Sequence, residues 1–228
     1  GNSSRIADAD KGANWLVFLL PYVDQASLYS EWKFNNTSNQ NPGRKTELAA
    51  SKCPSDPKSS SNFCSYAGGD WARGNYGLNA SPCNHGVGGG SSSQPGGMGS
   101  VNQSVRLQDI TDGTSNTIAV DELRAGQNDR DLRGSWAMPG LGSGTAAMFN
   151  DASTPNSTEP NSDDMENCAV AGLAGNPVQG MGCFDNSSTG QMTARSMHTG
   201  GVHSLLADGA VRFVNDSIDF QRNNSGCG

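Results

Sequence analysis

Residues Gly201 to Asp216 read GVHSLLADGAVRFVND, and this stretch decides the fold. Two runs of alternating apolar and polar residues flank Asp208 and Gly209, which is the pattern of a β-hairpin. Because a type I′ turn needs positive φ at both central residues, the Asp-Gly pair predicts that turn. The C-terminal part of the chain is therefore expected to be antiparallel β-structure.

Short strand patterns recur upstream of the hairpin. They are NFCSYAGG (62–69), GNYGLNAS (74–81), TIAVDEL (117–123) and RGSWAMPGLG (133–142). Residues 105–110 resemble the start of a helix. The Gly/Ser-rich segment near 84–100 and the acidic segment near 150–167 predict exposed loops. The motif CPSDP at 53–57 carries two prolines and predicts a fixed turn.

The most apolar segment, residues 12–34, predicts one broken helix or two short helices that meet at Pro21. Apolar residues recur at spacings of three and four and are expected to pack against a sheet. These residues are Trp15, Phe18, Leu19, Tyr22, Val23, Leu28, Tyr29 and Trp32. Together with the strands and with 30 glycines among 228 residues, this segment predicts a single α+β domain over 1–228 with long loops.

A formal net charge of -7 and a pI near 4.8 argue against nucleic acid or anionic membranes as main partners, because both attract basic surfaces. No run of eighteen apolar residues is present.

Six cysteines lie on scattered segments without a CxxC motif. With only three histidines, this spacing is not that of a zinc site, so no metal is assigned. An even number of cysteines predicts disulfides in an oxidising compartment, with buried free thiols as the alternative. The pairs expected are Cys53–Cys64, Cys168–Cys183 and Cys83–Cys227.

His198 and Asp208 are separated by nine residues and resemble an acid/base pair or metal ligands. No GxSxG motif supplies a nucleophile, and Asp208 belongs to the predicted turn. We therefore expect no catalytic residue here. The imidazole of His198 is expected instead to tie the incoming loop to the hairpin.

Two acidic clusters offer oxygen ligands for calcium, which stays unassigned because neither has EF-hand spacing. The first cluster comprises Asn128, Asp129 and Asp131, and the second comprises Asp163, Asp164 and Glu166. Both are expected to be solvated loops. Asp121 and Glu122, with Arg124, are expected to form an ion pair or a carboxylate dyad at most, because adjacent strand residues point to opposite faces.

The order of motifs resembles a known family. WLVFLLPYVDQASLY, CPSDP, NYGLN, DITDGTSNTIAVDE, RGSW and ARSMHTGGVHSLLADGAVRFVNDSID follow one another from Trp15 to Asp219. They resemble the planctomycete-type prepilin-like, or pseudopilin-like, proteins, formerly described as solute-binding-like proteins. The signature of that family is a histidine, nine residues and Asp-Gly, which His198, Asp208 and Gly209 match.

The resemblance implies a pilin-like head in which the N-terminal pilin helix is absent. It further implies a structural subunit or minor component of a type IV pilus-like or type II secretion-like filament. Its partners would be other pilin-like subunits, reached through the missing helix, which would also anchor the protein in the inner membrane before assembly. The location would be extracellular or periplasmic, and no cofactor or catalytic residue follows from the family.

A different class of function is an extracellular module that binds polysaccharide or another ligand. Its candidate ligand contacts are Trp71 and Trp136, placed between exposed loops, because loops on a rigid scaffold commonly carry recognition. A hydrolase that uses His198 is a third hypothesis.

Overall fold

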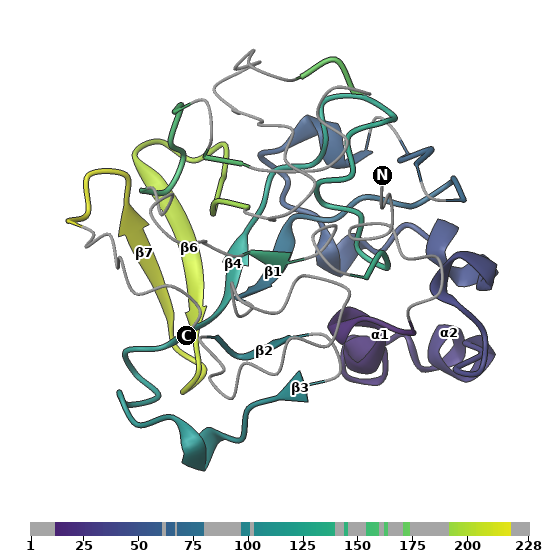
Figure 1. Cartoon of the computed structure of the whole chain (residues 1–228), viewed down its shortest axis with the longest axis horizontal. Helices are drawn as coiled ribbons and strands as arrows, with labels where there is room; N and C mark the ends of the chain where they lie inside the picture. The colour runs from purple at the N-terminus through teal and green to yellow at the C-terminus, as the bar shows by residue number, and fades with distance from the viewer. Residues whose placement is uncertain are drawn as a thin grey trace, which may run out of the picture.

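The computed structural model describes residues 12–60, 63–66, 68–79, 97–100, 103–139, 144–145, 154–159, 162–163, 171–173 and 192–219. These residues form an α+β fold in which a small twisted sheet borders short helices and long connections (Figure 1). None of the helices described is long and apolar enough to cross a bilayer.

The sheet has the strand order β5-β1-β4-β6-β7. Four strands are antiparallel: β1 (Tyr76–Asn79), β4 (Ile118–Glu122), β6 (Gly201–Leu206) and β7 (Val211–Asn215). The two-residue strand β5 (Gly144–Thr145) runs parallel to β1 at one edge. Between β1 and β4 in the sequence, β2 (Gly99–Ser100) and β3 (Gln103–Ser104) form a second, two-stranded sheet. The predicted strands 74–81 and 117–123 thus correspond to β1 and β4.

The predicted hairpin joins β6 to β7, but its turn differs from the expected type. Only Gly209 has positive φ, at 90°, whereas Asp208 does not. The N–H of Gly209 donates to the carbonyl of Leu206, and the N–H of Leu206 donates to the carbonyl of Ala210. This is a three-residue loop in which a glycine in the left-handed region follows the turn. One glycine therefore suffices where the type I′ turn would strain the aspartate.

The N-terminal segment forms two short helices, as expected. Helix α1 (Trp15–Leu19) begins at Asn14, whose side chain accepts a hydrogen bond from the Val17 N–H. Pro21 lies in the first turn of the 3₁₀ helix η1 (Leu20–Tyr22), and α2 (Ala26–Glu31) follows. The remaining 3₁₀ helices are η2 (Ser38–Gln40), η3 (Pro42–Lys45), η4 (Ala49–Ser51), η5 (Pro57–Ser60) and η7 (Leu107–Asp109). The last is all that forms of the helix expected near 105–110.

The buried face of this segment is only partly the predicted one: Trp32 lies in the core, and Trp15, Leu28 and Tyr29 pack against it. The core receives Leu16, Val17 and Leu20, whereas Phe18 is 52% and Tyr22 is 83% exposed. The prediction assumed one helical period from Trp15 to Val23. The inward face of α1 instead consists of Leu16 and Val17 and continues at Leu20, so Phe18, Leu19 and Tyr22 point outward.

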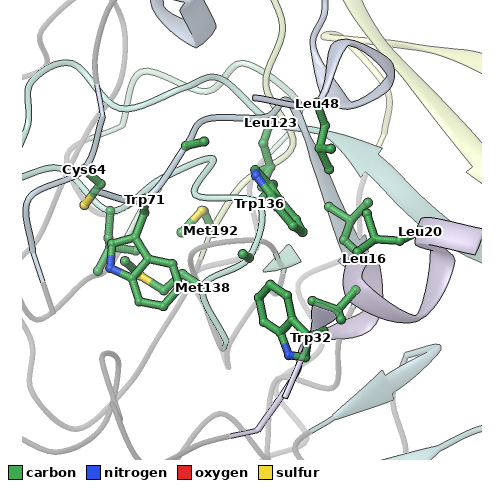
Figure 2. Packing of buried hydrophobic residues seen from close by; sticks show 14 of the residues in the cluster. Leu16, Leu20, Trp32, Leu48, Cys64, Trp71, Leu123, Trp136, Met138 and Met192 are labelled. Atoms are coloured by element: carbon green, nitrogen blue, oxygen red, sulfur yellow. The ribbon is translucent and has the colours of Figure 1, made fainter. Parts of the chain in front are cut away.

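The core is built around tryptophans (Figure 2). Trp71 and Trp136 are each 1% exposed, and the ring of Trp136 lies 6.1 Å from that of Trp32. The indole N–H of Trp71 donates to the carbonyl of Tyr66, and that of Trp136 donates to the carbonyl of Thr46. Trp71 and Trp136 therefore stabilise the core and cannot serve as the ligand contacts expected between exposed loops.

Two predicted strands are wrong. Among their described residues, 63–66 and 68–69 form an isolated bridge between Cys64 and Trp71, and 133–139 form one between Arg73 and Ser135. The buried guanidinium of Arg73 donates to the carbonyls of Asn128, Asp131 and Arg133. Arg73 thus holds the loop at 128–133 against the segment that carries Arg73.

The predicted disulfide between Cys53 and Cys64 is also wrong, because both are buried free thiols. Cys64 packs in the tryptophan core, where burial raises the pKa of its thiol. Cys53 faces His198 instead. The other four cysteines, Cys83, Cys168, Cys183 and Cys227, lie outside the described residues.

Candidate functional site

His198 lies in the turn that leads into β6, and the neighbouring backbone holds it there. Its N–H donates to the hydroxyl oxygen of Ser196, 3.0 Å away, and that hydroxyl donates to the carbonyl of Gly201 at 2.7 Å. Gly200 has a φ of 84°, which lets the chain turn sharply before the strand begins. The turn therefore aims the imidazole of His198 at the neighbouring strand β4.

Glu122, the last residue of β4, receives this imidazole. Its Oε1 lies 3.1 Å from Nε2 of His198, and its Oε2 accepts the N–H of His203 in β6 at 2.7 Å. The carboxylate is buried. Glu122 thus links the turn, β4 and β6, and His198 reaches the hairpin through Glu122 as well as through its ring contact with His203. Asp121, on the opposite face, instead accepts a hydrogen bond from Ser204.

Cys53 completes the cluster from a third segment. Its Sγ lies 3.6 Å from Nε2 of His198. Its N–H donates to Oδ1 of Asn75, and the amide of Asn75 donates to Oδ2 of Asp56. The same Asp56 oxygen accepts the N–H of Ala125, just beyond β4. The CPSDP motif is thus a turn, as predicted, and its buried aspartate fixes the turn against the sheet.

The donor atoms of Cys53, Glu122 and His198 all lie within 4.8 Å of one another. In the part of the chain that the structure describes, this is the group able to share one metal ion. A nucleophile–base–carboxylate relay would need the thiol and the carboxylate on different ring nitrogens. Here both face Nε2, so the geometry opposes such a relay. No hydrolytic role for His198 follows from this arrangement.

His203 borders the cluster but is half exposed. Its ring meets that of His198 edge to face at 5.0 Å, and its Nδ1 lies 3.6 Å from Oε2 of Glu122. An open pocket of about 290 Å³ lies on another side of His198, with Arg124, Arg195 and Asp216 among its lining residues. Solvent and small molecules therefore have access to the imidazole.

Asp208 is not a partner of His198. Its carboxylate accepts the N–H of Ala210 within the hairpin turn. The two residues flank opposite ends of β6, whose six residues span about 20 Å. The spacing of His198, Asp208 and Gly209 therefore records one strand between two turns rather than a single chemical site.

The acidic clusters do not form calcium sites in the described residues. Asp131 and Asp163 are fully buried, and both bind the guanidinium of Arg133, with N–O distances of 2.7 Å. Asp163 also accepts a hydrogen bond from Arg195. The expectation of solvated loops is therefore wrong at these positions, while Asp164 and Glu166 lie outside the described residues.

Electrostatics stabilise the charged forms in this buried network. Burial alone would raise the pKa of Asp131, but the charge and hydrogen bonds of Arg133 outweigh it and lower that pKa. Burial alone would lower the pKa of Arg133, but Asp131 and Asp163 raise it. The network has no vacant carboxylate oxygen comparable to the ligands that calcium requires.

The family described as "protein of unknown function (DUF1559)", SBP_bac_10, matches residues 1–221. The chain belongs to the DUF1559 family. The match covers both Cys53 and the His198 turn of this DUF1559 protein. No curated protein and no solved structure is detectably similar to it.

Sequence reasoning singled out His198 in this DUF1559 protein but missed its partners. Glu122 and Cys53 lie 76 and 145 residues away from it in the chain. The absence of a CxxC motif argues against a zinc site formed by one local segment. It carries no information about ligands that come from three separate segments. The one available signal was a carboxylate at the end of an apolar strand.

Proposed function

We propose that the chain is the globular head of a pilin-like subunit, a structural or minor component of a type IV pilus-like or type II secretion-like filament. The observation that carries the proposal is a pair of exposed apolar patches at opposite ends of the molecule. In Figure 1, which sets the longest axis horizontal, β7 lies at one end and α1 and α2 lie toward the other.

The hairpin patch consists of Leu205, Val211 and Phe213, beside His203. Leu205 pairs with Val211 and His203 pairs with Phe213, so all four side chains share one face. Val211 is 63% and Phe213 is 48% exposed. Among the described strands, β7 pairs only with β6 and forms an edge of the sheet. An apolar edge that neither proline nor a row of charges protects favours association with another chain.

The helical patch consists of Phe18, Leu19, Tyr22 and Phe34. Phe18 stacks on Phe34 with ring centroids 5.7 Å apart, so these exposed rings form a continuous surface. Sequence patterning assigned Phe18, Leu19 and Tyr22 of this patch to the core. The exposure of the patch supports a role in packing against another protein.

Two different patches at opposite ends favour head-to-tail contacts between copies. A contact between unlike surfaces leaves a free surface on each copy, and repetition produces an open filament unless a ring closes. This geometry supports a filament subunit more than a module that binds glycans, since Trp71 and Trp136 lie in the core. Export and an extracellular or periplasmic location are part of the proposal.

The test is to express the natural gene product in its source cells and to isolate sheared surface appendages. We expect the protein in the appendage fraction, and we expect Phe213→Ser to reduce its incorporation at least about tenfold. Leu107→Ser removes an exposed apolar side chain outside both patches and serves as the matched control. The proposal would be contradicted if the appendage fraction contained no wild-type protein and all of it remained in the soluble fraction.

A further inference from the structure

We propose that Cys53, Glu122 and His198 bind one Zn²⁺ ion through Sγ, Oε1 and Nε2, with a fourth position open to solvent. This inference is independent of the filament proposal. It rests on the convergence of three chemically different donor atoms from three distant segments of the chain.

Two of the three separations between donor atoms are close to those around tetrahedral zinc, and all three lie within 4.8 Å. Bonds of about 2.3 Å to sulfur and about 2.0 Å to nitrogen or oxygen separate sulfur from nitrogen by about 3.6 Å, and nitrogen from oxygen by about 3.3 Å. The corresponding distances here are 3.6 Å from Cys53 to His198 and 3.1 Å from His198 to Glu122. The ion would need only a small opening of the histidine–glutamate contact.

Hydrogen bonding alone explains this arrangement poorly. An imidazole Nε2 either donates one proton or offers one lone pair. Both the thiol of Cys53 and the carboxylate of Glu122 face this one atom of His198. A cation between the three donors would satisfy all of them at once, with thiolate, carboxylate and neutral imidazole as ligands.

Hydrogen bonds from neighbouring residues orient the ligands, as is usual at metal sites. The second oxygen of Glu122 accepts the N–H of His203, which turns Oε1 toward His198. The N–H of Cys53 is bound by Asn75, and Asn75 is buried and anchored on Asp56. These contacts fix two of the three ligands without occupying the proposed ligand atoms.

The donor set selects the kind of metal. Calcium and magnesium prefer shells made of oxygen, whereas thiolate with imidazole and carboxylate suits zinc. Three protein ligands with an accessible fourth position are typical of zinc sites that bind water or an outside ligand. The side chain of His198 is 29% exposed, so solvent can reach the cluster along the imidazole.

The experiment measures zinc bound per folded chain after equilibrium dialysis, followed by zinc X-ray absorption on the wild-type protein. We expect one ion, with one sulfur at about 2.3 Å and the other neighbours at about 2.0 Å. Cys53→Ser, Glu122→Gln and His198→Gln should each weaken binding at least about a hundredfold, beyond the usual effect of outer-shell changes.

Matched controls separate this site from other thiols and carboxylates. Cys64→Ala removes the buried core thiol, and Asp121→Asn removes the carboxylate on the opposite face of β4; both should keep the affinity within about threefold. Circular dichroism verifies that each variant is folded. If a ligand variant does not fold, the absorption spectrum of the wild-type protein still decides, as does a thiolate-to-cobalt band on Co²⁺ addition.

The inference is overturned by any of three results. Wild-type protein could bind no more Zn²⁺ than Cys53→Ser does. The bound ion could have only nitrogen and oxygen neighbours, or several sulfurs from other cysteines. Alkylation of Cys53 at the same rate with and without Zn²⁺ would equally exclude the zinc site, because a bound ion masks the thiolate.

Discussion

At the scale of single residues, Asp163 is a buried carboxylate shared between two arginines. Its Oδ2 accepts from Arg133 at 2.7 Å and from Arg195 at 2.9 Å, and its Oδ1 accepts the N–H of Thr193. The residue joins three segments of the chain. A segment that composition assigns to an exposed loop thus supplies a central part of the buried structure.

Asp163→Asn should lower the free energy of unfolding by about 3–5 kcal/mol, because it leaves two buried guanidinium groups without their shared charge. Chemical denaturation measures this loss. Asp70→Asn is the matched control, because Asp70 forms an exposed pair with Lys45 and its removal should leave the denaturation midpoint unchanged. If both substitutions lowered the free energy of unfolding equally, the buried network would contribute no more to stability than the exposed ion pair.

The lowered pKa of Asp131 predicts a loss of stability in acid. The unfolded chain takes up the proton near the ordinary pKa of 3.8, while the folded protein resists protonation to a lower pH. Stability from this group is therefore complete above that value and is lost as the pH falls through the native pKa. Denaturation midpoints measured from pH about 6 to about 2 should show the loss, and Asp131→Asn should flatten it. If the midpoint of Asp131→Asn depends on pH as steeply as that of the wild type, other groups cause the acid sensitivity.

At the scale of elements, the β6–β7 hairpin depends on two glycines for different reasons. Gly209 has a φ of 90°, and a Cβ there would meet nothing within 4 Å. At Gly201, a Cβ would collide with the backbone carbonyl of Val214 on the paired strand. The first glycine provides conformational freedom, and the second provides space between strands.

Gly209→Ala should therefore cost about 1–2 kcal/mol of stability through backbone strain alone. Gly201→Ala should cost more, and should also speed amide exchange in β7, because the strands must separate. Gly12→Ala, where a Cβ meets nothing and φ is not positive, is the control. Thermal unfolding and hydrogen exchange measure the loss of stability in each variant. The prediction is wrong if Gly209→Ala loses no more stability than Gly12→Ala.

At the scale of the whole molecule, the two exposed patches make a prediction about pairing. A chain with Val211→Ser and Phe213→Ser keeps only the helical patch, and one with Phe18→Ser and Tyr22→Ser keeps only the hairpin patch. Each should be monomeric alone. Mixed, they should form one-to-one dimers and nothing larger, because one intact patch of each kind meets the other.

Analytical ultracentrifugation at matched concentrations distinguishes the outcomes. Wild-type chain should form a ladder of larger species under the same conditions. If either double variant forms dimers by itself, its remaining patch binds its own kind, and the head-to-tail geometry is wrong. Leu107→Ser should associate as the wild type does.

Local patterns were sufficient for the α+β class, for strands β1 and β4, for the hairpin and for the break at Pro21. Each depends on side-chain alternation or turn preference over a few residues, which neighbouring residues impose. The same reasoning misplaced the aromatic stripe and the strands at 62–69 and 133–142. There, contacts with distant parts of the chain decide the outcome, as where the guanidinium of Arg73 binds the carbonyls of Asn128 and Asp131.

Local sequence patterns do not predict the site. Cys53, Glu122 and His198 meet because Asp56 and Asn75 fix one loop, β4 ends at Glu122, and Gly200 turns the chain into β6. A fixed loop, the end of a strand and a turn bring together three donor atoms from distant segments, and no spacing along the chain encodes their positions. The histidine of the signature was therefore visible in the sequence, while its chemistry arises from folding, because donor atoms can share an ion only when they converge in space.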